Sequence, residues 1–537
     1  MKKKLHNRLQ NSSYFLVLFF FLSCGSKSAI LSTPIENIDL VPLKVEQLTE
    51  IEKKEWSHLD LKKDTIPGVS LQRAYKELVK PKSKTIIVAV IDSGIDIDHE
   101  DLKGCIWVNS DEIPNNGKDD DTNGYIDDVH GWNFLGEANN EQLEYVRLVA
   151  SGDSSNPRYL EAKKLLSEEY ESNSRMKKQY DEILEQLTTA DAAVAKYLKK
   201  PVYTKEEVDG IITPDFELIR HINIIKQAYG FGFETIEACI KDLNSDLKTF
   251  NERLDYNLNI NFDGRKVVGD NPDDLSDRNY GNGDVRAKNG RTHGTHVSGI
   301  IAAKRNNGIG IDGAANNVKI MAIRNTPSGD EYDKDVALGV YYAVDNGAKV
   351  INMSFGKQFS PHSDWVRDAI AYAAEKDVLI VAAAGNDGEN TDEINYFPND
   401  QINNGVEVSN TFLKVGAIGP KYGSTLVAGY SNYGKNTVDV FAPGSQIYST
   451  YPKNDYEFAS GTSMAAPLVS GVAALIFSQY PNLSAAQVKH ILMTSGIAID
   501  KKVVLESGAI VPFSELSKSG KMVNAYNALI MASKLSK

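Results

Sequence analysis

Short runs of apolar, mostly β-branched residues recur along this chain, and helical patterns separate them. The first run covers residues 85–91, and later ones cover residues 318–323, 350–353, 378–383, 412–418 and 438–441. Continuous runs of this length suit strands that are buried on both faces, as in a parallel sheet. Helical spacing of apolar residues is found at residues 295–303, 333–346, 364–375 and 467–479. The alternation predicts an α/β fold with a mostly parallel central sheet, helices on both of its faces and right-handed crossovers.

The composition is that of a globular protein. Hydrophobic residues make up 42% and charged residues 24% of the 537 residues, which is ordinary for folded domains. The net charge of −13 argues against nucleic acid as the main partner, because an acidic surface repels phosphates.

The N-terminus has the pattern of an export signal. Basic residues at positions 2–4 and 8 precede an apolar run at residues 14–22, which is too short to span a bilayer, and Cys24 follows directly after Ser23. We expect residues 1–23 to be a lipoprotein signal peptide and Cys24 to carry the lipid. The protein would then be a membrane-anchored lipoprotein of the bacterial cell envelope. The alternative is ordinary signal cleavage near Ser23, with Cys24 incidental.

Three further segments follow the predicted signal peptide. Residues 24–66 are expected to form a tether and an N-terminal arm, and residues 67–537 the main domain. About sixty residues separate Cys24 from the first predicted strand, so we expect no compact pro-domain. Residues 137–262 are rich in Glu, Lys, Leu and Tyr and carry apolar helical stripes, which predicts a helical insertion. Cys105 and Cys239 would either form a disulfide or remain as two buried thiols.

Three motifs place an acid, an imidazole and an alcohol in one chain. Asp92 lies at the end of the first apolar run in Val90-Ile91-Asp92-Ser93-Gly94, His293 opens His293-Gly294-Thr295-His296, and Ser463 stands in Gly461-Thr462-Ser463-Met464-Ala465-Ala466-Pro467. Asn386 follows the run 378–383. Because ligand sites in α/β sheets lie at the carboxyl ends of strands, Asp92 and Asn386 are expected to share a site.

These residue types suit acyl transfer. A serine hydroxyl needs a base, and His293 is the candidate, while Asp92 would fix its tautomer and stabilise its positive charge. The side-chain amide of Asn386 and the backbone N–H of Ser463 would stabilise the tetrahedral oxyanion. We interpret His296 as structural.

The chain resembles the subtilisin-like serine peptidases, or subtilases, from about residue 67 to its C-terminus. The order Asp, His, Ser is the subtilisin order, and the asparagine motif also matches. The resemblance implies a serine endopeptidase that cleaves polypeptide substrates through an acyl-enzyme. It also implies that the extended substrate pairs with Ser354, Phe355 and Gly356, beside a specificity pocket that involves Ala383 and Gly385. Two departures stand out: the long insertion between Asp92 and His293, and Lys357 where a second glycine is usual.

A calcium loop is predicted before the insertion. Oxygen-bearing side chains alternate in residues 119–127, with glycine at the sixth position, as in the first part of an EF-hand loop. The candidate ligands are Asp119, Asp121, Asn123, Asp127 and the carbonyl of Tyr125. His130 occupies the twelfth position instead of the usual glutamate, so other groups would complete the shell, and the alternative is a solvated acidic turn. Asp270, Asp273 and Asp274 form a second candidate cluster. We expect no organic cofactor.

A rival interpretation makes the insertion the working surface. In that case the chain would be an inactive or latent binding or scaffold protein with a subtilase fold. Deleting residues 140–260 would abolish partner binding by a scaffold, raise the activity of a latent enzyme, or leave a peptidase able to cleave small peptides.

Overall fold

A nine-stranded sheet forms the centre of the molecule. The computed structural model describes residues 44, 46–81, 83–402 and 405–537, so the predicted signal peptide and Cys24 lie outside the described residues. The strand order is β10-β13-β7-β6-β5-β4-β1-β3-β2. Neighbouring strands are parallel except for the antiparallel pair β10 and β13. The sheet confirms the predicted mostly parallel α/β fold.

The strands lie close to the apolar runs of the sequence. Their bounds are β1 Ile86–Asp92, β2 Gly131–Asn133, β3 Val318–Arg324, β4 Val350–Met353, β5 Leu379–Ala383, β6 Phe412–Ile418, β7 Val440–Pro443, β10 Ile497–Ala498 and β13 Lys521–Met522. Two hairpins stand apart from the sheet, β8 Ile447–Tyr451 with β9 Asp455–Ala459 and β11 Lys502–Val504 with β12 Ile510–Pro512.

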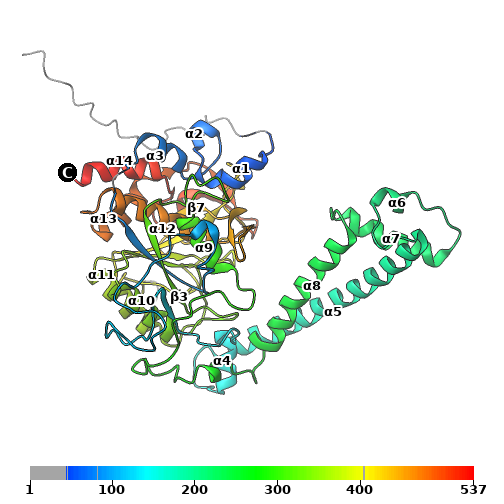
Figure 1. The fold of residues 1–537 in the computed structure, drawn as a ribbon, viewed down its shortest axis with the longest axis horizontal. Coiled ribbons are helices and arrows are strands. Elements are labelled where there is room, and N and C mark those ends of the chain that lie inside the picture. The colour runs from blue at the N-terminus through cyan, green and yellow to red at the C-terminus, as the bar shows by residue number, and fades with distance from the viewer. Residues whose placement is uncertain (1–43, 45, 82, 403–404) are drawn as a thin grey trace, which may run out of the picture.

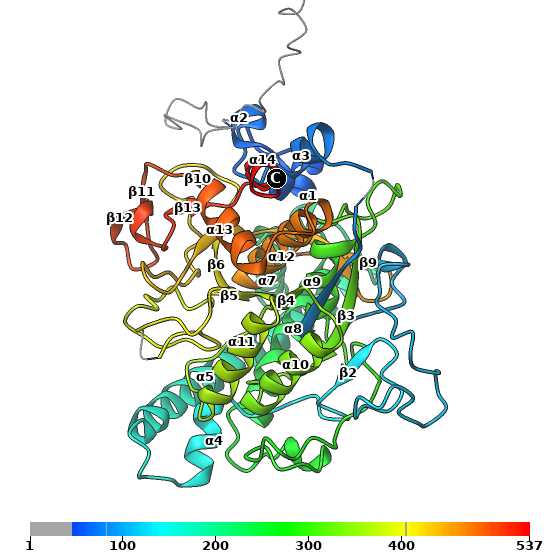
Figure 2. The same ribbon diagram turned by 90° about the vertical axis from the view of Figure 1, so that its left-hand side faces the viewer.

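Helices cover both faces of the sheet, as Figure 2 shows. One face carries α9 (His293–Ala302), α12 (Thr462–Gln479), α13 (Ala485–Ser495) and α14 (Ala525–Leu535), and the other carries α10 (Asp333–Asp345) and α11 (Ser363–Glu375). Alternate residues of β1 enter different cores: Val88 and Val90 join the first, whereas Ala89 and Ile91 join the second. This alternation explains why the run had to be apolar at every position.

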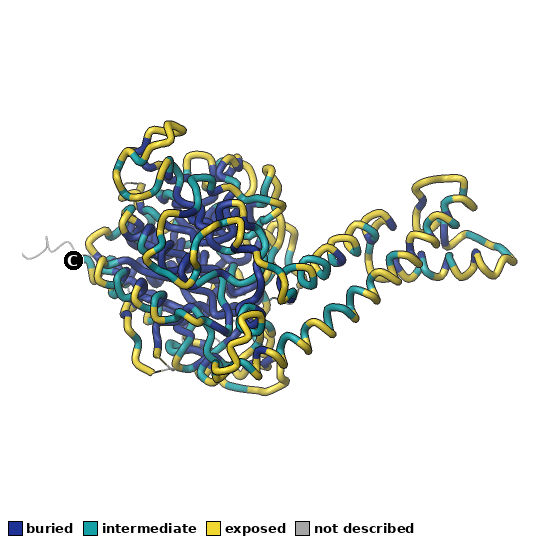
Figure 3. Tube along the Cα trace, turned by 90° about the horizontal axis from the view of Figure 1, so that it is seen from below, coloured by how far each residue is buried: buried dark blue, intermediate teal, exposed yellow. Residues whose placement is uncertain are grey.

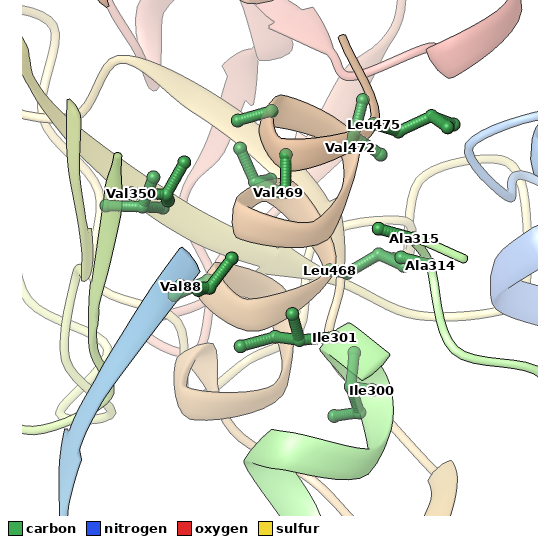
Figure 4. Close-up of a cluster of buried hydrophobic side chains, with 14 of the residues drawn as sticks. Val88, Ile300, Ile301, Ala314, Ala315, Val350, Leu468, Val469, Val472 and Leu475 are labelled. Atoms are coloured by element: carbon green, nitrogen blue, oxygen red, sulfur yellow. The ribbon is translucent and has the colours of Figure 1, made fainter. Parts of the chain in front are cut away.

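Helix α12 crosses the middle of the first core. Leu468, Val469 and Val472 of this helix lie between the strand residues Val88 and Val350 and helix α9 (Figure 4). Within the described residues, α12 is long and apolar enough to cross a membrane, but 89% of that window is buried inside the protein. Burial of this extent identifies it as a core helix.

The predicted helical insertion is confirmed and projects from the body, as Figure 1 shows in cyan and green. It comprises α4 (Glu144–Ser151), α5 (Tyr159–Leu198), α6 (Lys205–Asp209), α7 (Phe216–Gly230) and α8 (Ile236–Glu252). We call residues 144–252 the arm and the rest of the described chain the body. Helix α5 runs for 40 residues and pairs with α8, while α6 and α7 lie at the far end.

The arm has small cores at its ends. At the far end, Val194, Val208, Ile225 and Ile236 belong to one buried cluster. At the base, Val146 and Ala162 pack with Phe359 of the body. Between the ends most residues are half-buried or exposed (Figure 3). Ile183 of α5 is 49% exposed, because a pair of helices covers only part of the apolar side of each helix.

The segment before β1 packs on the body. It contains α1 (Glu50–Glu55), α2 (Leu61–Asp64) and α3 (Leu71–Glu77). Trp56 is 1% exposed, and its indole Nε1 donates to the carbonyl of Ser445 at 3.2 Å. Cys105 in the body and Cys239 in α8 are both free, so the disulfide alternative is not realised.

Candidate active site

Asp92 and His293 meet where β1 ends and α9 begins. His293 Nδ1 lies 2.8 Å from Asp92 Oδ1 and 3.0 Å from Oδ2. Asp92 is 1% exposed, and its Oδ1 also accepts from the backbone N–H of Ser93 at 2.7 Å. A β-carbon at Gly294 would lie 2.4 Å from the carbonyl oxygen of Gly94, so only glycine lets α9 begin this close to Asp92.

The environment of His293 raises its pKa. Burial alone would lower the pKa, but the charge of Asp92 and the hydrogen bond that His293 donates to it together outweigh burial. His296 behaves in the opposite way: burial lowers its pKa to about 4, and its Nε2 lies 3.1 Å from the carbonyl of Ile447. His296 is therefore a neutral structural residue, as predicted, and His293 is the imidazole available for proton transfer.

Ser463 lies in the first turn of α12. Its hydroxyl donates to the carbonyl of Ser354 at 3.0 Å, and the hydroxyl of Ser354 donates back to the carbonyl of Ser463 at 3.0 Å. Pro467 explains the second bond. In a regular helix the N–H of residue 467 would donate to the carbonyl of Ser463, but proline has no N–H, so Ser354 supplies the missing donor.

Buried polar groups hold this pair in place. Asn352 Nδ2 donates to Ser354 Oγ at 2.9 Å, and Ser470 Oγ donates to Asn352 Oδ1 at 2.8 Å. Asn352 and Ser470 are fully buried. The strand β4 and the helix α12 are therefore joined by satisfied hydrogen bonds on the inner side of the nucleophile.

Asn386 is oriented by the residue before the nucleophile. Its Oδ1 accepts from the backbone N–H of Thr462 at 2.8 Å and from the Thr462 hydroxyl at 3.0 Å. These bonds fix which end of the amide is the acceptor, so the NH₂ group of this exposed residue is the end left for an oxyanion. The backbone N–H groups at the start of α12 add a second source of positive potential.

One cavity of about 290 Å³ lies beside Asp92 and His293. Its lining includes Asp92, His293, Thr326 and Ser354. The hydroxyl of Ser463 bonds to Ser354 instead of to His293, and Ser354 shares the cavity with His293. Hydrogen bonds between a nucleophile and its base often tighten only when substrate is bound. The structure thus pairs Asp92 with His293, and it pairs Ser463 with Ser354, which lines the same cavity as His293.

Of the predicted substrate-binding residues, Ser354 lines this cavity, and the others lie just after β4 or at and after the end of β5. Ser354 is buried, Phe355 and Gly356 are half-buried, and Ala383 and Gly385 are buried. The backbone N–H of Gly385 donates to the hydroxyl of Thr462 at 3.1 Å. Gly356 and Gly385 both face the ring of Tyr396, a residue that the sequence analysis did not single out.

Lys357, where a second glycine was expected, turns away from the cleft. Its Nζ lies 2.8 Å from Glu144 Oε2 and 3.0 Å from Asp333 Oδ1, and its side chain is 2% exposed. Burial would lower the pKa of Lys357, but the charges of Asp333 and Glu144 raise it above its ordinary value. Because Glu144 begins α4, this buried ion pair ties the predicted substrate strand to the base of the arm.

The acidic loop brings together some of the predicted ligands. Carboxylate oxygens of Glu112, Asp119 and Asp121 lie within 4.8 Å of one another. Glu112 was missed because it precedes the loop by several residues, and it supplies a carboxylate where the EF-hand pattern lacks one. The carboxylate of Asp127 accepts backbone N–H bonds from Asn116 and Gly117 at 3.1 and 3.0 Å.

Two other predicted ligands have protein contacts of their own. Asn123 Nδ2 donates to Asp121 Oδ2 at 3.0 Å, and the ring of Tyr125 packs edge-on against Trp132 and Tyr342, at 4.9 Å in each case. The second candidate cluster is wrong as a calcium site. Asp270 is paired with Arg265 at 2.6 Å and with Lys334 at 2.7 Å, so protein cations already neutralise it.

The chain belongs to the subtilase family, whose model matches residues 83–509. It is 40% identical over 230 residues to a thermophilic serine proteinase of Bacillus sp. (strain AK1), covering 43% of this chain and 51% of that one. It is 41% identical over 197 residues to thermitase of Thermoactinomyces vulgaris, covering 36% and 64%. A solved structure of proteases from Pseudoalteromonas arctica PAMC 21717 shares 31% identity with a TM-score of 0.37, covering 48% and 81%. The chain thus matches about half to two thirds of the length of the two sequence relatives, and the predicted family is confirmed.

Proposed function

We propose that this chain is a serine endopeptidase that hydrolyses polypeptides through an acyl-enzyme. One observation carries the proposal: a buried carboxylate orients an imidazole on the wall of a cavity, and Ser354, on the same wall, accepts a hydrogen bond from Ser463 at the start of a helix. The two sequence relatives named above are called a serine proteinase and thermitase, which supports the same class of reaction.

The reaction follows from the atoms at the site. Ser463 Oγ leaves the carbonyl of Ser354, gives its proton to His293 Nε2 and forms a bond to the substrate carbonyl carbon. Asp92 stabilises the imidazolium, and Asn386 Nδ2 with the N–H of Ser463 stabilises the oxyanion. The C–N bond then breaks as His293 returns the proton to the leaving amine. Water then attacks the ester between Ser463 and the acyl group in the same way, with His293 as the base, and releases the carboxylic acid and the free serine.

A fluorophosphonate probe tests the nucleophile. We expect covalent labelling of the folded wild type at Ser463 and none in Ser463→Ala. Ser478→Ala is the matched control, because it removes a hydroxyl from the other end of the same helix and should label normally. A folded wild type that resists the probe, or a label that persists in Ser463→Ala, contradicts the proposal.

We also propose a structural Ca²⁺ in the acidic loop. Glu112, Asp119 and Asp121 offer the hard oxygen ligands that Ca²⁺ prefers. Asn123, Asp127 and the carbonyl of Tyr125 stay candidates for the remaining ligands.

Thermal unfolding tests the calcium site. At a Ca²⁺ concentration of 100 times Kd, binding to the native state adds about 2.7 kcal/mol of stability, so chelation should lower Tm. Asp119→Asn should abolish the effect of Ca²⁺, whereas Asp120→Asn, which is outside the cluster, should keep it. A melting curve indifferent to chelation and to added Ca²⁺ contradicts the site.

We propose that a lipid on Cys24 tethers the protein to a membrane of the bacterial envelope. The support is the pattern of basic residues, apolar run and cysteine in the sequence. Metabolic labelling with a radioactive fatty acid should mark the full chain and not Cys24→Ser. Equal labelling of both, or recovery of the wild type in the aqueous fraction, contradicts the tether.

A further inference from the structure

Two glycines on either side of the nucleophile face one aromatic ring. A β-carbon built on Gly356 would lie 2.5 Å from Tyr396 Cε1, and one built on Gly385 would lie 2.5 Å from Tyr396 Cζ. Both distances are far below van der Waals contact. The ring of Tyr396 therefore fills the space between the two segments, and only glycine at each position leaves room for it.

Those two segments are the ones that bracket Ser463. Gly356 comes two residues after Ser354, which exchanges hydrogen bonds with Ser463. Gly385 precedes Asn386, and both residues bond to Thr462. The resemblance to the subtilases implies that the side chain of the residue before the cleaved bond lies between these two segments.

The ring is held in place at several points. The phenol Oη donates to the carbonyl of Gly356 at 3.2 Å, and Lys414 Nζ donates to the backbone carbonyl of Tyr396 at 2.9 Å. The adjacent residue, Phe397, exchanges two backbone hydrogen bonds of 2.9 Å with Lys357. Burial and then the charge of Asp387 raise the pKa of the phenol, so the hydroxyl remains a donor.

We propose that Tyr396 is the specificity-determining residue of this site and restricts cleavage to bonds that follow a small residue: glycine, alanine or serine. The inference rests on the proposed peptidase function and names its substrate class. A side chain larger than a methyl or hydroxymethyl group meets the phenol ring before the carbonyl can reach Ser463. Tyr396 is half-buried, as expected of a side chain that closes a pocket open to solvent at one end.

The size of the effect follows from the chemistry of apolar pockets. One methylene group too many or too few changes kcat/KM by about 10- to 200-fold. A benzyl side chain exceeds a methyl by a whole ring, so we expect kcat/KM after alanine to exceed that after phenylalanine by at least about 100-fold.

Peptide amides that are identical except for the residue before the cleaved bond provide the test. Gly, Ala, Leu and Phe would be compared at that position with the wild type, Tyr396→Ala and Tyr396→Phe. Tyr396→Ala should raise kcat/KM for Leu and Phe and reduce the Ala-to-Phe ratio by at least about tenfold. Tyr396→Phe keeps the ring and loses only the bond to Gly356, so it should keep the wild-type ratio.

A second measurement does not depend on the variants. Phosphonate probes that carry a methyl or a benzyl side chain should label the wild type at rates that differ by at least about 100-fold in favour of methyl. Equal rates, wild-type cleavage after Phe as fast as after Ala, or an unchanged ratio in a folded Tyr396→Ala would overturn the role of Tyr396. A wild type that accepts neither probe and cleaves none of the peptides instead overturns the proposed function itself.

Discussion

The body and the arm fix their residues in space by different means. Every residue of α12 from Thr462 to Ser478 is buried except Ser463. Helix α5 buries only Ala162, Leu187, Ala190 and Val194 of its 40 residues. The body therefore sets the position of its nucleophile by close packing on all sides. The arm depends on the stiffness of two paired helices and on contacts at its ends.

The difference separates two tasks. Acyl transfer needs reacting groups held to within a fraction of an ångström, and the body has the packing to do this. A long, exposed helical pair cannot provide such precision, but it can carry a surface far from the cleft. This division of tasks predicts that substitutions in the body abolish peptide hydrolysis, whereas changes in the arm leave it intact.

The largest effect is expected at Ser463. Ser463→Ala should lower kcat by about a million-fold, a magnitude taken from a related enzyme of the family. The melting temperature should stay near that of the wild type, because the lost hydroxyl is not part of the core. Peptide hydrolysis and calorimetry measure the two quantities. Residual activity within a factor of ten of the wild type would contradict the proposal that Ser463 in the body is the nucleophile.

Asp92 should come next. Asp92→Asn should lower kcat by about ten-thousand-fold, because the imidazole loses the partner that fixes its tautomer. The pH profile gives a second readout. His293 must be neutral to act as a base, and Asp92 raises its pKa, so activity falls as pH drops through that raised pKa. Without the carboxylate the acid limb should move to lower pH.

The exposed Asp98 supplies a matched control for this change. Asp98→Asn should leave both the rate and the acid limb where they are. An acid limb that does not move in Asp92→Asn would show that another group controls it.

Removing the buried ion pair between Lys357 and the base of the arm should have an intermediate effect, and this effect should be on stability. Lys357→Met removes the buried cation beside Asp333, while Glu144 keeps its ion pair with Arg147, at a cost of about 3 kcal/mol in the free energy of unfolding. Lys248→Ala on α8 is the control, since Lys248 is 68% exposed and its pair with Glu252 spans 3.8 Å, and such pairs contribute about 0–1 kcal/mol. Denaturant unfolding measures both, and equal losses would contradict the anchoring role of Lys357.

Shortening the arm should have the smallest effect on chemistry. The rings of Tyr180 and Phe250 lie 5.2 Å apart, so replacing residues 184–246 with a short Gly-Ser turn keeps the paired base. We expect kcat and KM for short peptides to be unchanged. Higher activity would show that the arm keeps the enzyme latent. Loss of binding to a protein partner, with peptide cleavage intact, would show that it recruits.

The sequence was sufficient wherever a residue's role is local. The apolar run ending in Asp92 predicted both a buried strand and the position of the acid, and the helical spacing at residues 467–479 predicted most of the helix that carries Ser463. The proposed roles of Tyr396 and Glu112 could not be predicted, because each depends on contacts with other segments of the chain. Lys357 was recognised as unusual, but only the fold shows that its charge points into the base of the arm. Packing between segments, and not the pattern within one, decides such residues.

The proposed peptidase activity makes each copy of the protein a substrate for other copies. Helix α12 carries the nucleophile through the centre of the main core. A copy whose body unfolds therefore loses its active site at the same time and can act only as a substrate. A nick in the arm has no such consequence, since its helices contribute nothing to the core around α12. Autoproteolysis should therefore cleave the arm first and leave the active site in the body intact.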